Sequence, residues 1–152
     1  MRRYYYLLLA ILLSLSVVSC GSGNSATNPN NVGLFGNWNI AMYPTNNPNP
    51  AYVFALAMSQ EGGSTYSGAS IAYNGSVPPP SNMCINASSL RATATTNRDN
   101  TFTMTITDTS SNTIISVQGS LSSQTTTLAG TYTNPSSQSC SESQGSMSMV
   151  PQ

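Results

Sequence analysis

The sequence predicts an all-β fold: a single antiparallel up-and-down meander of about eight strands that closes into a small barrel. Apolar residues alternate with polar ones along most of residues 34–152, which is the period of a strand with one buried face. Turn-forming residues separate these segments at hairpin spacing. Of the 132 residues after position 20, 56 are Ser, Thr or Asn, which suits solvated strand faces. A two-layer β-sandwich is the alternative, because it also buries one face of each strand.

The clearest strand is expected at residues 101–107. Phe102, Met104 and Ile106 point to one side and four threonines to the other. Weaker alternation runs from Cys84 to Ala94. Further strands are expected to bury one face made of Trp38, Ile40, Met42; Tyr52, Phe54, Leu56, Met58; Ala69, Ile71, Tyr73; Ile115, Val117, Gly119, Leu121; Leu128, Gly130, Tyr132; and Met147, Met149.

Turns are expected at residues 61–64, 97–100, 109–112 and 122–124, each at hairpin spacing. Two longer connections, 43–50 and 74–83, are expected to lie outside any strand ladder, because they carry several prolines, which lack the N–H that a ladder requires. A third longer connection, 134–144, carries Cys140.

The first twenty residues have the order of a secretory signal. Arg2 and Arg3 precede a Leu-rich apolar stretch over residues 4–18, and small residues follow. Val17, Val18 and Ser19 directly before Cys20 resemble the lipobox of bacterial lipoproteins. That resemblance implies a signal peptide over 1–19, a lipid on Cys20, a tether over 20–33 and a β domain over 34–152. The alternative is an ordinary secretory signal that happens to end at a cysteine.

The lipobox resemblance also implies a location. The lipid would anchor the chain to a membrane of the bacterial cell envelope, and Gly21 after the cysteine favours the outer membrane under enterobacterial sorting. With Cys20 acylated, Cys84 and Cys140 remain in an exported chain, and a disulfide between them is expected. Closing a loop of roughly 57 residues would stabilise the fold by about 4 kcal/mol.

The scarcity of charge argues against several functions. After Arg3 the chain has two arginines, no lysine and no histidine, so neither a basic surface for nucleic acid nor a histidine metal site is expected. No cofactor-binding motif is present. Glycosidase chemistry would need a carboxylate pair, such as Glu61 with Glu142 or Asp99 with Asp108. All four are expected in or beside solvated turns, so the chain is expected not to be an enzyme.

Two family resemblances concern the β domain. The Gly36-Asn37-Trp38 start is similar to that of lipocalin-like and avidin-like barrels, in which the tryptophan lines one end. More of the chain resembles small uncharacterised lipoproteins of acidobacteria, which share a lipobox, a Ser/Thr/Asn tether, a Gly-x-Trp first strand and a Gly130-Thr131-Tyr132 strand before a cysteine loop. These resemblances imply a location and a barrel, but no activity.

The expected function is therefore a small binding module for a small apolar ligand or a glycan. Its candidate ligand-binding residues are Trp38, Tyr52, Tyr73 and Tyr132, because amphipathic rings are numerous for so small a domain. The alternative for these rings is that they fill the core. The alternative function is a structural component that contacts another envelope protein.

Overall fold

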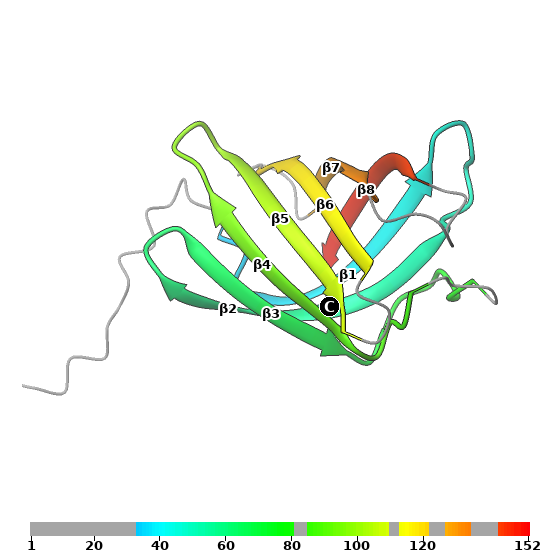
Figure 1. The fold of residues 1–152 in the computed structure, drawn as a ribbon, viewed down its shortest axis with the longest axis horizontal. Coiled ribbons are helices and arrows are strands. Elements are labelled where there is room, and N and C mark those ends of the chain that lie inside the picture. The colour runs from blue at the N-terminus through cyan, green and yellow to red at the C-terminus, as the bar shows by residue number, and fades with distance from the viewer. Residues whose placement is uncertain (1–32, 81–84, 110–112, 122–126, 135–142) are drawn as a thin grey trace, which may run out of the picture.

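The computed structural model describes residues 33–80, 85–109, 113–121, 127–134 and 143–152. The predicted signal, Cys20, Cys84, Cys140 and Glu142 lie outside the described residues. Eight strands form a closed barrel in chain order (Figure 1). They are β1 Gly36–Pro44, β2 Tyr52–Gly62, β3 Thr65–Ile71, β4 Leu90–Thr96, β5 Thr101–Asp108, β6 Thr113–Ser120, β7 Leu128–Thr133 and β8 Gln144–Pro151.

The predicted up-and-down barrel is confirmed, and the sandwich alternative is wrong. Each strand pairs antiparallel with its sequence neighbours. The ring closes where β1 pairs with β8, from Trp38 opposite Pro151 to Pro44 opposite Gly145. Closure leaves the described strands without an exposed sheet edge, so pairing with another chain's strand has no free ladder to extend.

The barrel interior is one continuous cluster of buried apolar side chains. Tyr52 and Tyr132 meet edge to face with ring centroids 6.0 Å apart. Trp38 donates its indole N–H to the Leu34 carbonyl at 2.9 Å, beside the start of β1. The predicted inner faces of β1, β2, β5, β6, β7 and β8 are confirmed: Trp38, Ile40, Met42, Tyr52, Phe54, Leu56, Met58, Phe102, Met104, Ile106, Ile115, Val117, Leu128, Tyr132, Met147 and Met149 are all buried.

The predicted inner face of β3 is wrong. Gly68 lies opposite Met58, and Ser70 lies opposite Leu56, so Gly68 and Ser70 share the inner face. Ala69 and Ile71 therefore point outward, and Tyr73 follows the strand end. Glycine suits this inner position, because a Cβ there would come within 2.3 Å of the Met58 sulfur. The strand expected between Cys84 and Ala94 also begins later, at Leu90.

The outer face of β1 and β2 is buried. Asn39, Ala41, Val53 and Ala55 point outward between the inner-face residues, yet each is at most 8% exposed. The connection after β3 lies against this face: the Asn39 side chain donates to the Asn74 carbonyl at 2.7 Å and accepts the Asn74 N–H at 3.3 Å. The described part of the proline-rich loop is thus outside the ladder, as expected, and is fastened to this face at Asn39. The expectation that residues 43–50 lie outside the ladder is wrong at its start, because Tyr43 and Pro44 pair with Ser146 and Gly145 of β8.

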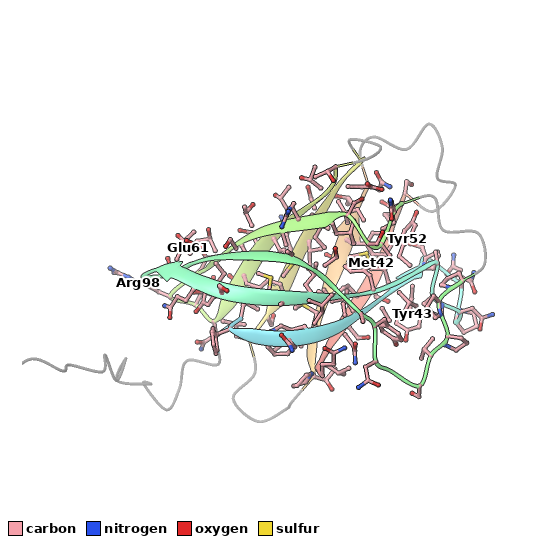
Figure 2. All side chains as sticks on the ribbon, turned by 90° about the horizontal axis from the view of Figure 1, so that it is seen from below. Met42, Tyr43, Tyr52, Glu61 and Arg98 are labelled. Atoms are coloured by element: carbon pink, nitrogen blue, oxygen red, sulfur yellow. The ribbon has the colours of Figure 1, made fainter. Side chains whose placement is uncertain are left out.

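The two ends of the barrel differ. We call the end where β1 begins the entry end; it also carries the tight β2–β3 and β4–β5 turns. The opposite, loop end carries the longer connections after β1, β3 and β7 (Figure 1). Glu61 and Arg98 lie at the entry end and Tyr43 and Tyr52 at the loop end (Figure 2). In the described part of the chain, no helix has the length and apolarity needed to cross a membrane.

Candidate functional site

The four aromatic residues proposed to bind a ligand do not share a surface. Trp38, Tyr52 and Tyr132 are 5%, 1% and 1% exposed and belong to the interior cluster. This arrangement agrees with the alternative in which the rings fill the core. Tyr73 lies outside the barrel beyond β3, where burial and then the nearby Tyr43 raise its pKa, while a hydrogen bond involving the Val77 backbone opposes the rise.

Asp99 and Asp108 do not form the pair that a glycosidase needs, and Glu142, the expected partner of Glu61, lies outside the described residues. Asp99 is in the β4–β5 turn and Asp108 ends β5, so the length of β5 separates them by roughly 20 Å. Glycosidase carboxyl groups lie about 5 to 9.5 Å apart. Asp99 is exposed, and the Thr101 hydroxyl and backbone N–H hold the pKa of its carboxyl below the ordinary value.

Asp108 is not the solvated turn residue expected from its position. It is 1% exposed, and it accepts hydrogen bonds from the Asn86 backbone N–H and, at 2.9 Å, from the Ser89 hydroxyl. These contacts fasten the segment before β4 to the end of β5. Asp108 thereby has a structural role that the sequence pattern does not reveal.

An open groove of about 680 Å³ lies on the surface at the loop end, and we call it the end groove. Three segments line it: residues 44–48 after β1, 131–133 at the end of β7, and 144–146 at the start of β8. Sequence analysis identified the first of these only as part of a loop. Because the groove depends on β8 lying between β7 and β1, no local pattern indicates it.

Backbone hydrogen bonds fix the loop that forms one wall of the end groove. The Thr45 N–H donates to the Gln144 carbonyl at 3.2 Å, and the Asn47 N–H donates to the Pro44 carbonyl at 3.0 Å. The Asn47 side chain in turn accepts the Asn49 N–H at 2.9 Å. Asn46 adopts a φ of 66°, a left-handed conformation that asparagine tolerates better than most residues. The wall is therefore held in one arrangement before any ligand arrives.

A second hollow of about 480 Å³ lies on the outer wall of the barrel, which we call the side hollow. It is lined by residues 101–103 of β5, 118–120 of β6 and 129–131 of β7. The facing glycines Gly119 and Gly130 lie within it. A Cβ on Gly130 would come within 2.4 Å of the Gln118 carbonyl oxygen, so only glycine fits there.

Among the described residues that line the two hollows, none is acidic or basic. Apart from Pro48 and Ala129, their exposed side chains end in hydroxyl or carboxamide groups. The described residues also hold no cluster of three or more His, Cys, Asp or Glu that could bind a metal ion. The chemistry on offer is therefore neutral hydrogen bonding, with both donors and acceptors available.

Comparison with known proteins identifies the fold. No family model and no curated protein matches the chain. Among solved structures, the chain is similar to a redesigned β-barrel, with a TM-score of 0.51 and 15% sequence identity. The match covers 78% of this chain and 90% of the other. At this identity the likeness concerns the fold alone: the chain has the architecture of a small closed β-barrel.

Proposed function

We propose that this chain is a non-catalytic, lipid-anchored lipoprotein of the cell envelope whose barrel binds a neutral glycan in the end groove. The observation that carries the proposal is a groove of about 680 Å³ at the end of the barrel away from the predicted tether; its described lining residues include no charged side chain, and backbone hydrogen bonds fix the loop that forms one wall. Ligand pockets commonly have volumes of about 300 to 1,000 Å³.

The chemistry of the lining supports a glycan. Thr131, Thr133 and Ser146 are exposed, and each hydroxyl can both donate and accept a hydrogen bond. The Asn47 and Gln144 carboxamides add further donors and acceptors. A neutral sugar presents the same two functions on its hydroxyl groups. A charged ligand would be desolvated here without an opposite charge among the lining residues.

An apolar ligand inside the barrel is less well supported. Eight-stranded barrels hold either side chains or one small ligand in their interior. Here Tyr52, Phe54 and Phe102 are at most 1% exposed. They belong to one continuous cluster of buried side chains that fills the described interior. The binding surface is therefore assigned to the outside.

Anchoring through Cys20 would orient this surface. The tether joins the domain before Gly36, so the entry end would face the membrane and the end groove would face away from it. Phe35 is 71% exposed beside this entry point and would lie on the side of the domain that faces the membrane. Mass measurement of the membrane-extracted protein should show a diacylglyceryl group on Cys20. Cys20→Ala should release the chain from the membrane, whereas retention would contradict the anchor.

A disulfide between Cys84 and Cys140 is part of the same proposal. The described residues on either side of both cysteines adjoin the loop end of the barrel: Ile85 precedes β4, and Asn134 follows β7. Mass spectrometry with and without reduction should show a peptide that contains both cysteines. Two free thiols in protein isolated from the envelope would contradict the bond.

Glycan binding can be tested with the full chain in detergent on an array of neutral and charged glycans. We expect binding to neutral members only. Thr133→Arg should weaken that binding at least tenfold, because it places a long charged side chain in the groove. Thr93→Arg is the matched control, since Thr93 is an exposed threonine on β4 outside both hollows. Binding to no neutral glycan, or equal losses from both variants, would reject the proposal.

A further inference from the structure

The end groove and the side hollow meet at Thr131, which lines both. Together they extend from the loop after β1 across β8, β7 and β6 to the start of β5. Each part alone could hold a compact molecule, whereas the joined surface crosses β8, β7, β6 and β5. Its direction relative to the strands decides what it can hold.

The joined surface follows one cross-strand row of the barrel. Ser146 pairs with Thr131, Thr131 pairs with Gln118, and Gln118 pairs with Thr103. All four residues are exposed on the outer face. Neighbouring strands lie about 4.8 Å apart, so the row from Ser146 to Thr103 is about 14 Å long. It offers one hydrogen-bonding side chain per strand.

We propose, on the basis of the proposed function, that the ligand is an extended neutral glycan chain that lies across the strands along this row. The length of one pyranose unit in an extended chain is close to the spacing between strands. Successive sugar units would therefore meet Ser146, Thr131, Gln118 and Thr103 in turn.

The absence of charge along the whole path distinguishes this ligand from other polymers. A polyanion such as a nucleic acid or an acidic polysaccharide would meet neither Lys nor Arg among the lining residues. An extended peptide commonly binds by adding a strand to a sheet edge, and the described strands leave none open. A neutral polysaccharide needs neither a charge nor an edge.

The test measures affinity against chain length with the full chain in detergent. The probes are soluble β-1,4-linked oligomers of glucose, mannose and xylose, from dimers to hexamers. For at least one sugar we expect affinity to rise about tenfold between dimer and tetramer, as two further units gain hydrogen bonds, and then to level off. Equal affinity of dimers and hexamers would overturn the extended site but leave the end groove intact.

Variants in the side hollow sharpen the test. Thr103→Arg should lower hexamer affinity about tenfold, to the value for the dimer, and leave dimer affinity unchanged. Thr105→Arg, which introduces the same charge on the same strand outside both hollows, should change neither. An unchanged hexamer affinity in Thr103→Arg would overturn the proposal. If no oligomer binds, or if an uncharged extended peptide binds instead, the extended glycan site is rejected; if the neutral glycan array is blank as well, the proposed function fails with it.

Discussion

Two sides of the barrel wall both have a buried apolar inner face, but their outer faces differ in burial. On β1 and β2, Asn39, Ala41, Val53 and Ala55 point outward and are buried, and the loop after β3 is hydrogen-bonded to Asn39; we call this the covered side. On β4, β5 and β7 most outward residues are threonines, and Thr93, Thr103 and Thr131 are exposed; we call this the threonine side. The same ring of hydrogen bonds thus supports a wall that is buried on both faces on one side and on its inner face alone on the other.

This difference shows which interactions each side depends on. A threonine-side strand buries one face, and its β-branched outer residues are suited to a pleated surface in water. A covered-side strand buries both faces, so its outer residues contribute burial energy as core residues do. Outward residues on the covered side should therefore be as sensitive to substitution as inward ones, and those on the threonine side should tolerate change.

The largest expected contrast comes from placing a carboxylate on each side. Val53→Asp puts an unpaired charge at an outer position that is 1% exposed, and it should cost about 4 kcal/mol of unfolding free energy or abolish folding. Val53→Ala should still fold, with a loss of about 2 kcal/mol. Thr105→Asp should change the unfolding free energy by no more than about 0.5 kcal/mol. Urea unfolding measures all three, and similar losses for the two Asp variants would contradict the comparison.

The next contrast concerns the fastening of the covering loop. Asn39→Ala removes both side-chain hydrogen bonds to the Asn74 backbone, and it should cost about 1 to 3 kcal/mol. The covering loop should then be cut faster in limited proteolysis. Thr93→Ala, an exposed outer position on the threonine side, serves as the control and should lose no more than about 0.5 kcal/mol. An Asn39→Ala protein as stable as that control would show that the loop is held by packing alone.

On the threonine side, the β4–β5 turn should matter more than the outer side chains. Asn100 has a φ of 61°, and its N–H donates to the Asn97 carbonyl at 3.3 Å. Asn100→Ala should cost about 1 kcal/mol, because alanine is strained in the left-handed region, whereas Asn100→Gly should be neutral or stabilising. Thermal unfolding of the two variants tests this prediction. A lower melting temperature for Asn100→Gly than for Asn100→Ala would refute it.

The smallest expected effect is the alkaline behaviour of Tyr73. Its folded-state pKa is raised above 10.0 by burial and by Tyr43. Its contribution to stability is therefore complete below the unfolded pKa and is lost as pH rises through the folded pKa, since the unfolded chain loses the proton first. Tyr73→Phe should lose slightly less stability between neutral and strongly alkaline pH. Urea midpoints over that range measure the difference, and a parallel decline in both proteins would count against it.

The comparison also explains which parts of the fold were predictable from sequence. On the threonine side, Phe102, Met104 and Ile106 alternate with threonines because one face meets the core and the other meets water. On β3 the same rule selects the wrong face, since Ala69 and Ile71 point outward while Gly68 and Ser70 point inward. Apolarity marks burial, but it does not distinguish burial in the barrel from burial at an outer position.

The candidate site was less predictable than the fold. The outer threonines could be identified one strand at a time, but the row through Ser146, Thr131 and Gln118 exists only after ring closure fixes the register. Asp108 was expected in water because it ends a strand beside a turn. Its burial results from the segment at Asn86 and Ser89, whose side chains carry no pattern that indicates this contact.

Closure between β1 and β8 places the first and last strands side by side. The Gln152 N–H donates to the Asn37 carbonyl at 2.9 Å, so the end of the chain meets the beginning of β1. The β1–β8 pair is therefore one of eight equivalent strand pairs in the ring, and the chain could be opened at another of them. A circular permutant with residue 152 joined by a flexible linker to residue 33, so that Leu34 is kept, and with new termini at the exposed Gly63 should form the same barrel.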